Sequence, residues 1–400
     1  MRPRAPAILG RRALPEGAVP PPPQAAADSL TPMPDPSILV SICRRFLVPG
    51  DIVDITPYGT GHINQTFVVT TDQAGQTVRY LLQRLNTGVF QRPREVMANI
   101  VAVTGHIRRR LEEDGHLISR RVLTLIHSAE DEAPFVEDPE HGFWRCYLFI
   151  EGARTYDVIL RTEQAFEAAK AFGAFQYQLS DYAGPALHET IPQFHHTPTR
   201  LQRLREAAAQ DVAGRLATCG AEVDFALARS PLAETLVGLA ATGEIPLRIT
   251  HNDTKLNNVM LDQTTGQGIC VVDLDTVMPG HSLCDFGDMV RTACNPLAED
   301  DPHAEGVVAR ADMFEALARG YLVGTAGTLR PVEREHLAVA GQLLTYECGV
   351  RFLTDHLQGD TYFRTHRPGQ NLDRARNQFA LLRSLESQAQ ALMDRIRDLV

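Results

Sequence analysis

The residue pattern of this 400-residue chain changes once, near residue 150, and that change restricts the possible folds more than any other feature. Before it, segments rich in Val, Ile, Thr and aromatic residues predict five strands, at 52–56, 63–70, 78–85, 122–126 and 144–150. A short helix is predicted at 38–47, and a longer one over 93–111 follows the third strand. Strands followed by helices favour an α+β fold with two unlike parts.

After residue 150 the apolar residues mostly recur at helical spacing. This spacing predicts helices around 166–179, 201–212, 307–322, 331–357 and 371–398. The region 249–286 is an exception, because two short apolar runs, 259–261 and 269–272, flank a Thr-Thr-Gly-Gln turn and predict a hairpin. We therefore expect a small lobe over 37–150 with a five-stranded antiparallel sheet, and a mostly helical large lobe over 151–400.

The first 36 residues are set apart by proline. They hold ten of the 25 prolines, including the run Pro20 to Pro23. Such a segment forms neither helix nor sheet and buries little, so we expect residues 1–36 to be a disordered extension.

Composition excludes several classes of protein. No apolar run approaches the ~20 residues that a membrane helix needs. A net charge of −10 argues against a nucleic-acid partner. The seven cysteines include no Cys-x-x-Cys pair, which favours reduced thiols over a disulfide framework or a zinc site. Since the N-terminus also lacks the apolar segment of a signal peptide, we expect a cytoplasmic protein.

The densest polar run reads His-Asn-Asp-Thr-Lys-Leu-Asn-Asn over 251–258, and Asp-Leu-Asp follows at 273–275. Phosphoryl transfer to a hydroxyl requires a carboxylate that accepts the proton, oxygen ligands for Mg²⁺ and a cation near the transferred group. These two segments contain all of those groups. The alternative is that they are ordinary loop residues, since Asn, Asp and Thr are common in turns.

Each requirement has a candidate in these segments. Asp253 would be the base, Lys255 the phosphate cation, and Asn258 and Asp273 the Mg²⁺ ligands. Asp275 would share a strand face with Asp273 and assist the metal. The chain has only two lysines, Lys170 and Lys255, so a lysine in this short window supports the catalytic interpretation.

These segments resemble the catalytic loop of the aminoglycoside phosphotransferase and choline kinase superfamily, whose fold is protein-kinase-like. Further segments resemble its N-acetylhexosamine 1-kinase branch, namely 80–86, 194–198, 273–280, 285–291, 349–355 and 371–379. The resemblance covers about residues 50–390. It implies a bilobal kinase fold and transfer of the γ-phosphate of ATP, with Mg²⁺, to the anomeric hydroxyl of an N-acetylhexosamine.

The small lobe contains candidate nucleotide contacts. Gly59 and Gly61 lie in a turn between the first two strands, where missing side chains let backbone N–H groups approach phosphate. A plain hairpin turn is the alternative. The resemblance adds Asn64 and Thr66 to this nucleotide loop.

The third strand departs from the superfamily pattern. Kinase-like folds usually place a lysine there, paired with an acid on the inserted helix. This chain has Gln83, which carries no charge, followed by Arg84, which a regular strand directs to the opposite face. Which of the two meets phosphate stays open, and so does a pseudokinase without activity. Glu95 is the candidate acid, or else a solvated residue of the first helical turn.

The remaining candidates come from the interlobe hinge and the acceptor side. The backbone of Phe149, Ile150 and Glu151 would meet adenine at the hinge. Arg351 and Asp355 lie four residues apart on one helix and could bind sugar hydroxyls or simply form an ion pair.

The pair His195 and His196 could bind sugar or serve as loop structure. The resemblance further implies that Asp285, with Asp288 nearby, braces the catalytic loop.

Two other functions were weighed against the sugar kinase. A kinase for an aminoglycoside or choline would favour a pocket of carboxylates or aromatic rings. The mixture of arginine, histidine and aspartate suits a neutral sugar better. A nucleotide-binding pseudokinase is the third possibility. Both a monomer and a homodimer fit the sequence.

Overall fold

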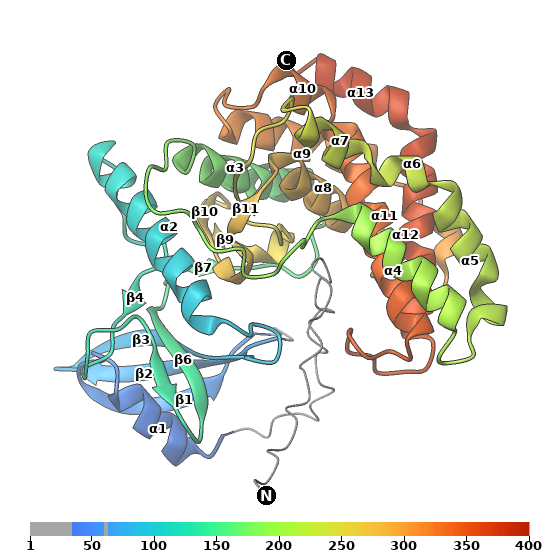
Figure 1. The fold of residues 1–400 in the computed structure, drawn as a ribbon. Helices are drawn as coiled ribbons and strands as arrows, with labels where there is room; N and C mark the ends of the chain where they lie inside the picture. The colour runs from blue at the N-terminus through green and yellow to red at the C-terminus, as the bar shows by residue number, and fades with distance from the viewer. Residues whose placement is uncertain (1–33, 60–62, 400) are drawn as a thin grey trace, which may run out of the picture.

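The computed structural model describes residues 34–59 and 63–399, which form a β-rich small lobe and a helical large lobe (Figure 1). Both kinds of structure and the antiparallel sheets agree with the predicted α+β, kinase-like class. Most of the predicted extension lies outside the described residues. The predicted extension ended at residue 36, but Asp35 already caps a helix, α1, at Pro36–Arg44.

The small-lobe sheet has six strands where the sequence predicted five. Its order is β1-β2-β3-β6-β4, with β5 paired to β6. The bounds are Asp51–Pro57 for β1, Gln65–Gln73 for β2, Gln76–Leu85 for β3, Leu125–Ile126 for β4, Val136–Asp138 for β5 and Gly142–Leu148 for β6. β5 is three residues long, too short to show a period. β4 is shorter than predicted, because Val122 and Leu123 are buried in a hydrophobic cluster outside the strand.

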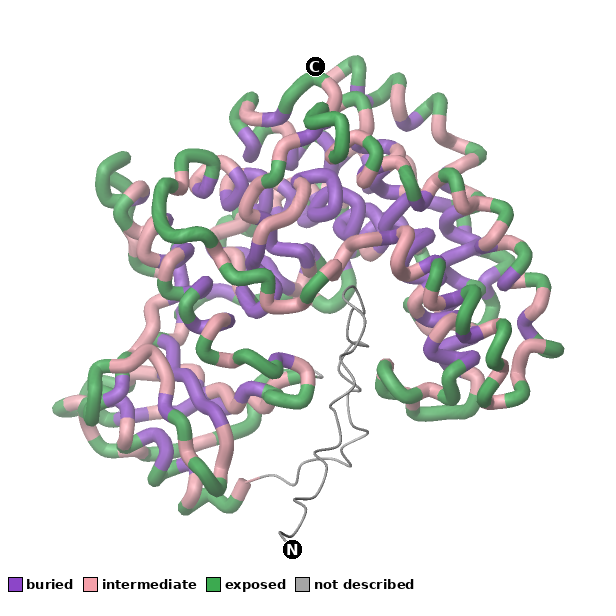
Figure 2. The backbone as a smooth tube through the Cα atoms, in the orientation of Figure 1, coloured by how far each residue is buried: buried purple, intermediate pink, exposed green. Residues whose placement is uncertain are grey.

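Each face of this sheet is covered by a different helix. Side chains that alternate along β3 and β6, such as Leu82 and Trp144, pack on α1. The other face carries Phe143 and Tyr147 and packs on α2, Pro93–Glu113. The buried residues of α2 share one cluster with large-lobe residues, so the two lobes are joined by a common apolar core. Figure 2 shows buried residues, in purple, in both lobes.

Five helices build the centre of the large lobe. They are α3 at Thr162–Gln178, α8 at Ser282–Ala293, α9 at Ala311–Gly324, α11 at Leu337–Leu357 and α12 at Gln370–Ser387. The pair α3 and α9 approaches closely at glycines. A Cβ at Gly320 would lie 2.2 Å from the Phe166 carbonyl oxygen, and one at Gly173 would lie 2.6 Å from that of Tyr321. Only glycine permits this backbone contact.

Shorter helices surround that centre: α4 at Thr197–Gln210, α5 at Leu216–Ala228, α6 at Ser230–Ala233, α7 at Thr235–Ala241, α10 at Pro331–Glu335 and α13 at Ala389–Arg397. The helix predicted over 331–357 is divided at His336, and that over 371–398 is divided at Gln388. The seven cysteines are buried and unpaired, as expected. Within the described residues no helix combines the length and apolarity that crossing a bilayer requires.

The predicted hairpin is present as β9, Val259–Asp262, and β10, Gly268–Val271. The short strand β7, Ala153–Arg154, pairs with β9, and β8, Arg248–Thr250, pairs with β11, Met278–Gly280. Three short 3₁₀ turns lie at Leu256–Asn258, Leu274–Thr276 and Ala304–Gly306. This arrangement brings residues 251–258 and 273–275 to one end of the hairpin.

Candidate active site

A buried carboxylate, Asp285, binds the backbone of the loop at 251–258. Asp285, on α8, accepts hydrogen bonds from the backbone N–H of His251 at 3.0 Å and of Asn252 at 2.8 Å, and from the Gln176 amide at 2.7 Å. Asn252 has a φ of 65° and donates to the Thr276 carbonyl oxygen at 3.0 Å. Asp285 therefore braces the loop, as the resemblance implied.

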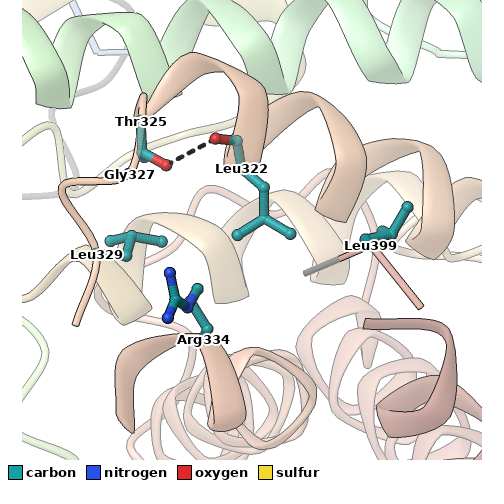
Figure 3. Close-up of a pocket in the computed structure, with 6 residues that line it drawn as sticks. All are labelled: Leu322, Thr325, Gly327, Leu329, Arg334 and Leu399. Atoms are coloured by element: carbon teal, nitrogen blue, oxygen red, sulfur yellow. Dashed lines mark hydrogen bonds between the residues drawn. The ribbon is translucent and has the colours of Figure 1, made fainter. Parts of the chain in front are cut away.

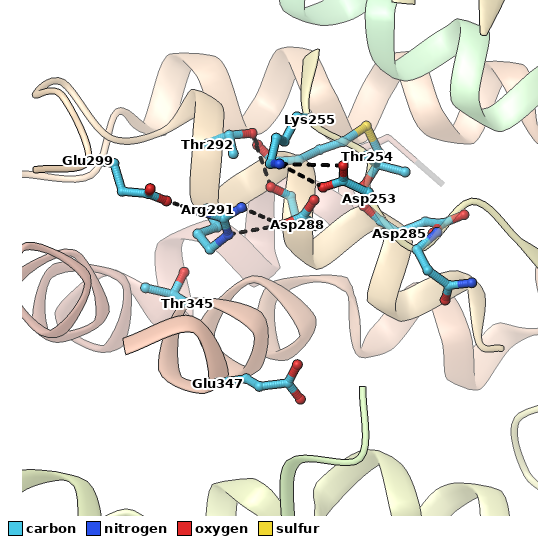
Figure 4. A network of polar contacts seen from close by, with 12 residues as sticks. Asp253, Thr254, Lys255, Asp285, Asp288, Arg291, Thr292, Glu299, Thr345 and Glu347 are labelled. Carbon is cyan, nitrogen blue, oxygen red and sulfur yellow. Dashed lines mark hydrogen bonds and ion pairs between the residues drawn. The ribbon is translucent and has the colours of Figure 1, made fainter. Parts of the chain in front are cut away.

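Asp253 projects from this loop between two side chains of the same loop. Lys255 Nζ lies 3.1 Å from one carboxylate oxygen (Figure 4). Asn258 Nδ2 lies 3.3 Å from the other. Burial would raise the pKa of Asp253, but the Lys255 charge, the Lys255 hydrogen bond and the Arg291 charge act together against it, and the net effect is a lowered pKa. The carboxylate is therefore ionised near neutral pH and able to accept a proton.

Lys255 is itself close to a second acid. The charge of Asp253 raises the pKa of the Lys255 ammonium. Burial opposes this effect, and the charge of Asp288 adds to it. Asp288 also pairs with Arg291 at 2.8 Å, and Arg291 reaches Glu299 at 2.7 Å (Figure 4). The loop cation thus lies at the end of a chain of alternating charges.

The prediction that Asp273 and Asp275 share a strand face is wrong. Strand β10 ends at Val271, Asp273 has a φ of 59°, and Asp275 lies in the 3₁₀ turn that follows. Asp275 is buried, pairs with Arg145 and accepts a hydrogen bond from Asn64 Nδ2 at 2.7 Å. Its oxygens are engaged within the protein, so it is not a free metal ligand.

Asn258 and Asp273 remain as possible Mg²⁺ ligands, and their surroundings fit the ion. Burial, followed by the nearby charges of Asp275 and Asp253, raises the pKa of Asp273 to about 6. A divalent cation would relieve that repulsion. Within the described residues no three His, Cys, Asp or Glu side chains form a metal cluster. Mg²⁺ bound to a nucleotide needs only one or two protein carboxylates.

The residues expected in the nucleotide loop face the same region. Asn64 accepts a hydrogen bond from the Asn86 N–H at 3.0 Å while it donates to Asp275. Thr66 Oγ1 accepts from Gln83 Nε2 at 3.0 Å. Gly59 has a φ of 79° with open space where a Cβ would be, whereas Gly61 lies outside the described residues.

Two small-lobe candidates lie away from this site. Arg84 is on the α1 face of the sheet, because side chains alternate along β3, and its guanidinium lies 6.0 Å from the Trp144 ring centre. Glu95 pairs with Arg92 at 2.9 Å. Arg84 is therefore not a phosphate contact, and Glu95 is not the partner of the third-strand residue.

The residue that the sequence analysis missed is Arg145 on β6. It lies opposite Gln83 in the strand pairing, and its Nε donates to Gln83 Oε1 at 2.9 Å. The guanidinium is 1% exposed and forms a hydrogen-bonded ion pair with Asp275. The sequence could have revealed it, because Arg145 stands among the apolar residues of a predicted strand, and charged residues are rarely buried there unless they are paired.

The hinge residues follow β6, which ends at Leu148 instead of the predicted residue 150, and one of them is already engaged. The Phe149 N–H donates to the Arg79 carbonyl oxygen at 3.0 Å, and the Arg79 guanidinium lies 4.2 Å from the Phe149 ring centre. The Glu151 side chain pairs with Arg79. The Phe149 N–H is therefore used by β3, which leaves the backbone of Ile150 and Glu151 as the candidate adenine contact.

His195 connects the catalytic loop to α11. Its Nδ1 lies 2.8 Å from Glu347 Oε1, and its Nε2 lies 2.9 Å from the Asn252 carbonyl oxygen. Both partners only accept hydrogen bonds, so both ring nitrogens carry protons. His196 instead caps α4 through Thr199. His195 therefore presents no free ring nitrogen to a sugar, which corrects its expected binding role. The cap uses only Nδ1 of His196, so the binding role of His196 stays a prediction.

Asp355 is also engaged within the protein. Its carboxylate accepts the backbone N–H groups of Thr361, Tyr362 and Phe363 at 2.7–2.9 Å and the amide of Asn371 at 2.8 Å. It holds a turn and is not a free sugar ligand. Arg351 remains a candidate, with its guanidinium 5.4–6.0 Å from the ring centres of Phe194, Tyr362 and Phe363.

A cavity of about 200 Å³ lies elsewhere, at the end of α9 (Figure 3). Its lining comprises Leu322, Thr325, Gly327, Leu329, Arg334 and Leu399. None of these is a candidate residue. A second cavity of about 100 Å³ lies between α2, α3 and β10 and is mostly apolar. Neither cavity contributes to the site.

A β-rich lobe, a helical lobe and an ionised aspartate near a second acid, Asp273, are together typical of a kinase-like phosphotransferase. The model of the phosphotransferase enzyme family matches residues 54–331, and the chain belongs to this family. That family is the one the catalytic loop resembled. The N-acetylhexosamine branch stays a prediction.

Solved structures of similar fold cover nearly the whole chain. A spectinomycin phosphotransferase in complex with ADP and spectinomycin has a TM-score of 0.57 and 13% identity, over 89% of this chain and 99% of its own. Choline kinase from Cryptosporidium parvum has a TM-score of 0.53 and 16% identity, over 92% and 98%. An aminoglycoside phosphotransferase from Alicyclobacillus acidocaldarius has 0.55 and 14%, over 93% and 98%. At these identities the likeness concerns the fold.

Proposed function

We propose that this protein is an ATP- and Mg²⁺-dependent kinase that phosphorylates the anomeric hydroxyl of an N-acetylhexosamine. The observation that carries the proposal is Asp253, ionised and held by Lys255 and Asn258 beside the acidic residue Asp273. A pseudokinase would not need this arrangement. The ADP complex of the spectinomycin phosphotransferase of similar fold supports a nucleotide as donor.

The roles follow from the geometry. Asp253 accepts the proton of the acceptor hydroxyl as its oxygen attacks the γ-phosphorus. Lys255 offsets charge on the transferred group. Asn258 and Asp273 would hold Mg²⁺, which when bound neutralises phosphate charge.

The acceptor side favours a neutral or anionic substrate over a cation. Burial, and next the charge of Arg351, lower the pKa of Arg200 to about 10, so two guanidinium groups lie close together there. Arg203 adds a third positive charge near Arg200. Cationic aminoglycosides or choline would be repelled, whereas hydroxyl and acetamide oxygens can accept hydrogen bonds from arginine.

The acids of the acceptor side do not reverse this preference. Glu347 pairs with His195, and Asp355 holds its turn. The aromatic rings around Arg351 offer apolar surfaces for a sugar ring. The second candidate is a kinase for an amine, since a choline kinase and an aminoglycoside phosphotransferase have a similar fold.

A substrate panel separates these possibilities. ADP release is measured with ATP and Mg²⁺ against N-acetylglucosamine, N-acetylgalactosamine, choline and kanamycin, and the product's phosphate is located by ³¹P and ¹H NMR. We expect turnover on an N-acetylhexosamine with phosphate on C1. Turnover on the amines alone, or phosphate on C6, would contradict the assignment, and nucleotide binding without any transfer would indicate a pseudokinase.

A further inference from the structure

The small lobe lacks a lysine where kinase-like folds usually place one, but it does not lack a cation. Gln83 stands on β3, and Arg145 stands directly opposite it on β6. Opposite residues of antiparallel strands project to the same face of a sheet, so both side chains leave on the side away from α1. The positive charge therefore lies on β6, the strand next to β3.

The contacts of Arg145 fix its guanidinium in this place. Nε donates to Gln83 Oε1 at 2.9 Å, and Nη1 pairs with Asp275. Gln83 is held in turn by Thr66, and the second oxygen of Asp275 by Asn64. A continuous polar network therefore runs from the first residues of β2, next to the glycine turn, to the segment that carries Asp273.

This network reproduces the parts of a lysine–acid pair with other residues. Arg145 provides the cation, and Asp275 provides the acid. Gln83 orients the guanidinium by accepting a hydrogen bond from it. Arg145 also lies close enough to lower the pKa of Asp273. The cation that the sequence offered instead, Arg84, lies on the opposite face, and Glu95 pairs with Arg92.

We propose that Arg145 replaces the third-strand lysine as the small-lobe cation that binds the nucleotide's phosphates, with Asp275 as its acidic partner. The inference rests on the proposed function only in that the protein binds a nucleotide. It is independent of the acceptor. A guanidinium has five N–H donors, and with Nε and Nη1 used by Gln83 and Asp275, Nη2 is the nitrogen that would bond a phosphate oxygen, as a lysine does elsewhere.

The test compares ADP with adenosine by calorimetric titration in the presence of Mg²⁺ and without acceptor. Arg145→Gln should weaken ADP binding by about tenfold or more, since a charge-assisted bond to phosphate is lost, and leave adenosine binding within about twofold. A role confined to holding Asp275 would act through the Mg²⁺ ligand Asp273 and would weaken ADP binding only while Mg²⁺ is present, so the titration is repeated in EDTA, where the loss from Arg145→Gln should persist. Arg84→Gln is the matched control and should bind ADP as the wild type does.

Two further variants guard against a folding defect. Arg145→Gln with Asp275→Asn removes both members of the buried pair, so no unpaired carboxylate remains, and it should still bind ADP weakly. Gln83→Lys with Arg145→Gln restores the usual arrangement and should recover part of the lost ADP affinity. Circular dichroism confirms that each variant is folded.

The outcomes separate the two proposals. Wild-type ADP affinity in the folded Arg145→Gln, Asp275→Asn variant, or equal losses for ADP and adenosine in Arg145→Gln, would overturn the role of Arg145 alone. A wild-type protein that binds no ADP would overturn the proposed function, and the role of Arg145 with it.

Discussion

At the scale of the residue, His195 is held as a cation. Both of its ring nitrogens face acceptors, the Glu347 carboxylate and the Asn252 carbonyl oxygen. Burial lowers the pKa of His195, but the Glu347 charge and hydrogen bond outweigh it, so the pKa is raised. Burial likewise raises the pKa of Glu347, but the charge and hydrogen bond of His195 and the charges of Arg200 and Arg351 together lower it to about 2. The pair ties the loop of Asp253 to α11.

This predicts a pH-dependent contribution to stability. Because the folded pKa of His195 exceeds its unfolded value of about 6.5, its contribution is full below pH 6.5 and is lost as pH rises through the folded value. The contribution of Glu347 is full above its unfolded pKa of about 4.3 and is lost only as pH falls through about 2. Both charges therefore act fully between about pH 4.5 and 6.5.

His195→Gln should lower the free energy of unfolding by about 3 kcal/mol at pH 6, and by less at pH 9, in urea denaturation. Glu347→Gln removes the same charged pair, so its destabilising effect should likewise be larger at pH 6 than at pH 9. The double variant should cost less than the sum of the single ones. A loss for His195→Gln that is equal at pH 6 and pH 9 would contradict the charged pair.

At the scale of the element, the contact of α3 with α9 depends on missing side chains. Gly320→Ala would place a Cβ 2.2 Å from the Phe166 carbonyl oxygen, and the backbone cannot yield cheaply there. We expect a loss of about 2–3 kcal/mol in the free energy of unfolding, typical of overpacking.

The matched control is Gly238→Ala in α7, where a Cβ meets nothing within 4 Å. Alanine is the better helix former, so this change should stabilise by up to about 1 kcal/mol. Thermal denaturation of the two variants measures both effects. Equal effects of the two substitutions would show that close packing does not distinguish these sites.

At the scale of the whole molecule, the lobes share a core. Residues of α2, such as Ile100 and Val103, lie in one buried cluster with Phe175 and Met260 of the large lobe. Asn99 of α2 also donates to the Val277 carbonyl oxygen at 3.0 Å. We therefore expect the two lobes to unfold as a single cooperative unit.

The lone tryptophan makes this testable. Trp144 is fully buried in the small lobe, so its fluorescence reports on that lobe, while far-UV circular dichroism reports mainly on large-lobe helices. Thermal unfolding should give coincident transitions by the two probes. Two midpoints separated by several degrees would mean that the lobes unfold independently.

Patterns that are local in sequence predicted the architecture well. Alternation identified the longer strands, and the hairpin with its two flanking polar segments located the catalytic loop. The site failed where a role depends on distant partners. Asp355 and His195 are occupied by neighbouring backbone or side chains, Asp275 lies in a turn instead of a strand, and Arg145 became visible only through its pairing with Gln83.

The central claim is that Asp253 is the base of a phosphotransferase, and turnover of Asp253→Asn tests it most directly. Asparagine keeps the shape but cannot accept the hydroxyl proton, so kcat with ATP and an N-acetylhexosamine should fall by at least about a hundredfold. ADP binding should be retained. Asp54→Asn, at an exposed carboxylate of β1, is the control and should leave kcat unchanged. Near-wild-type turnover of Asp253→Asn would contradict the account.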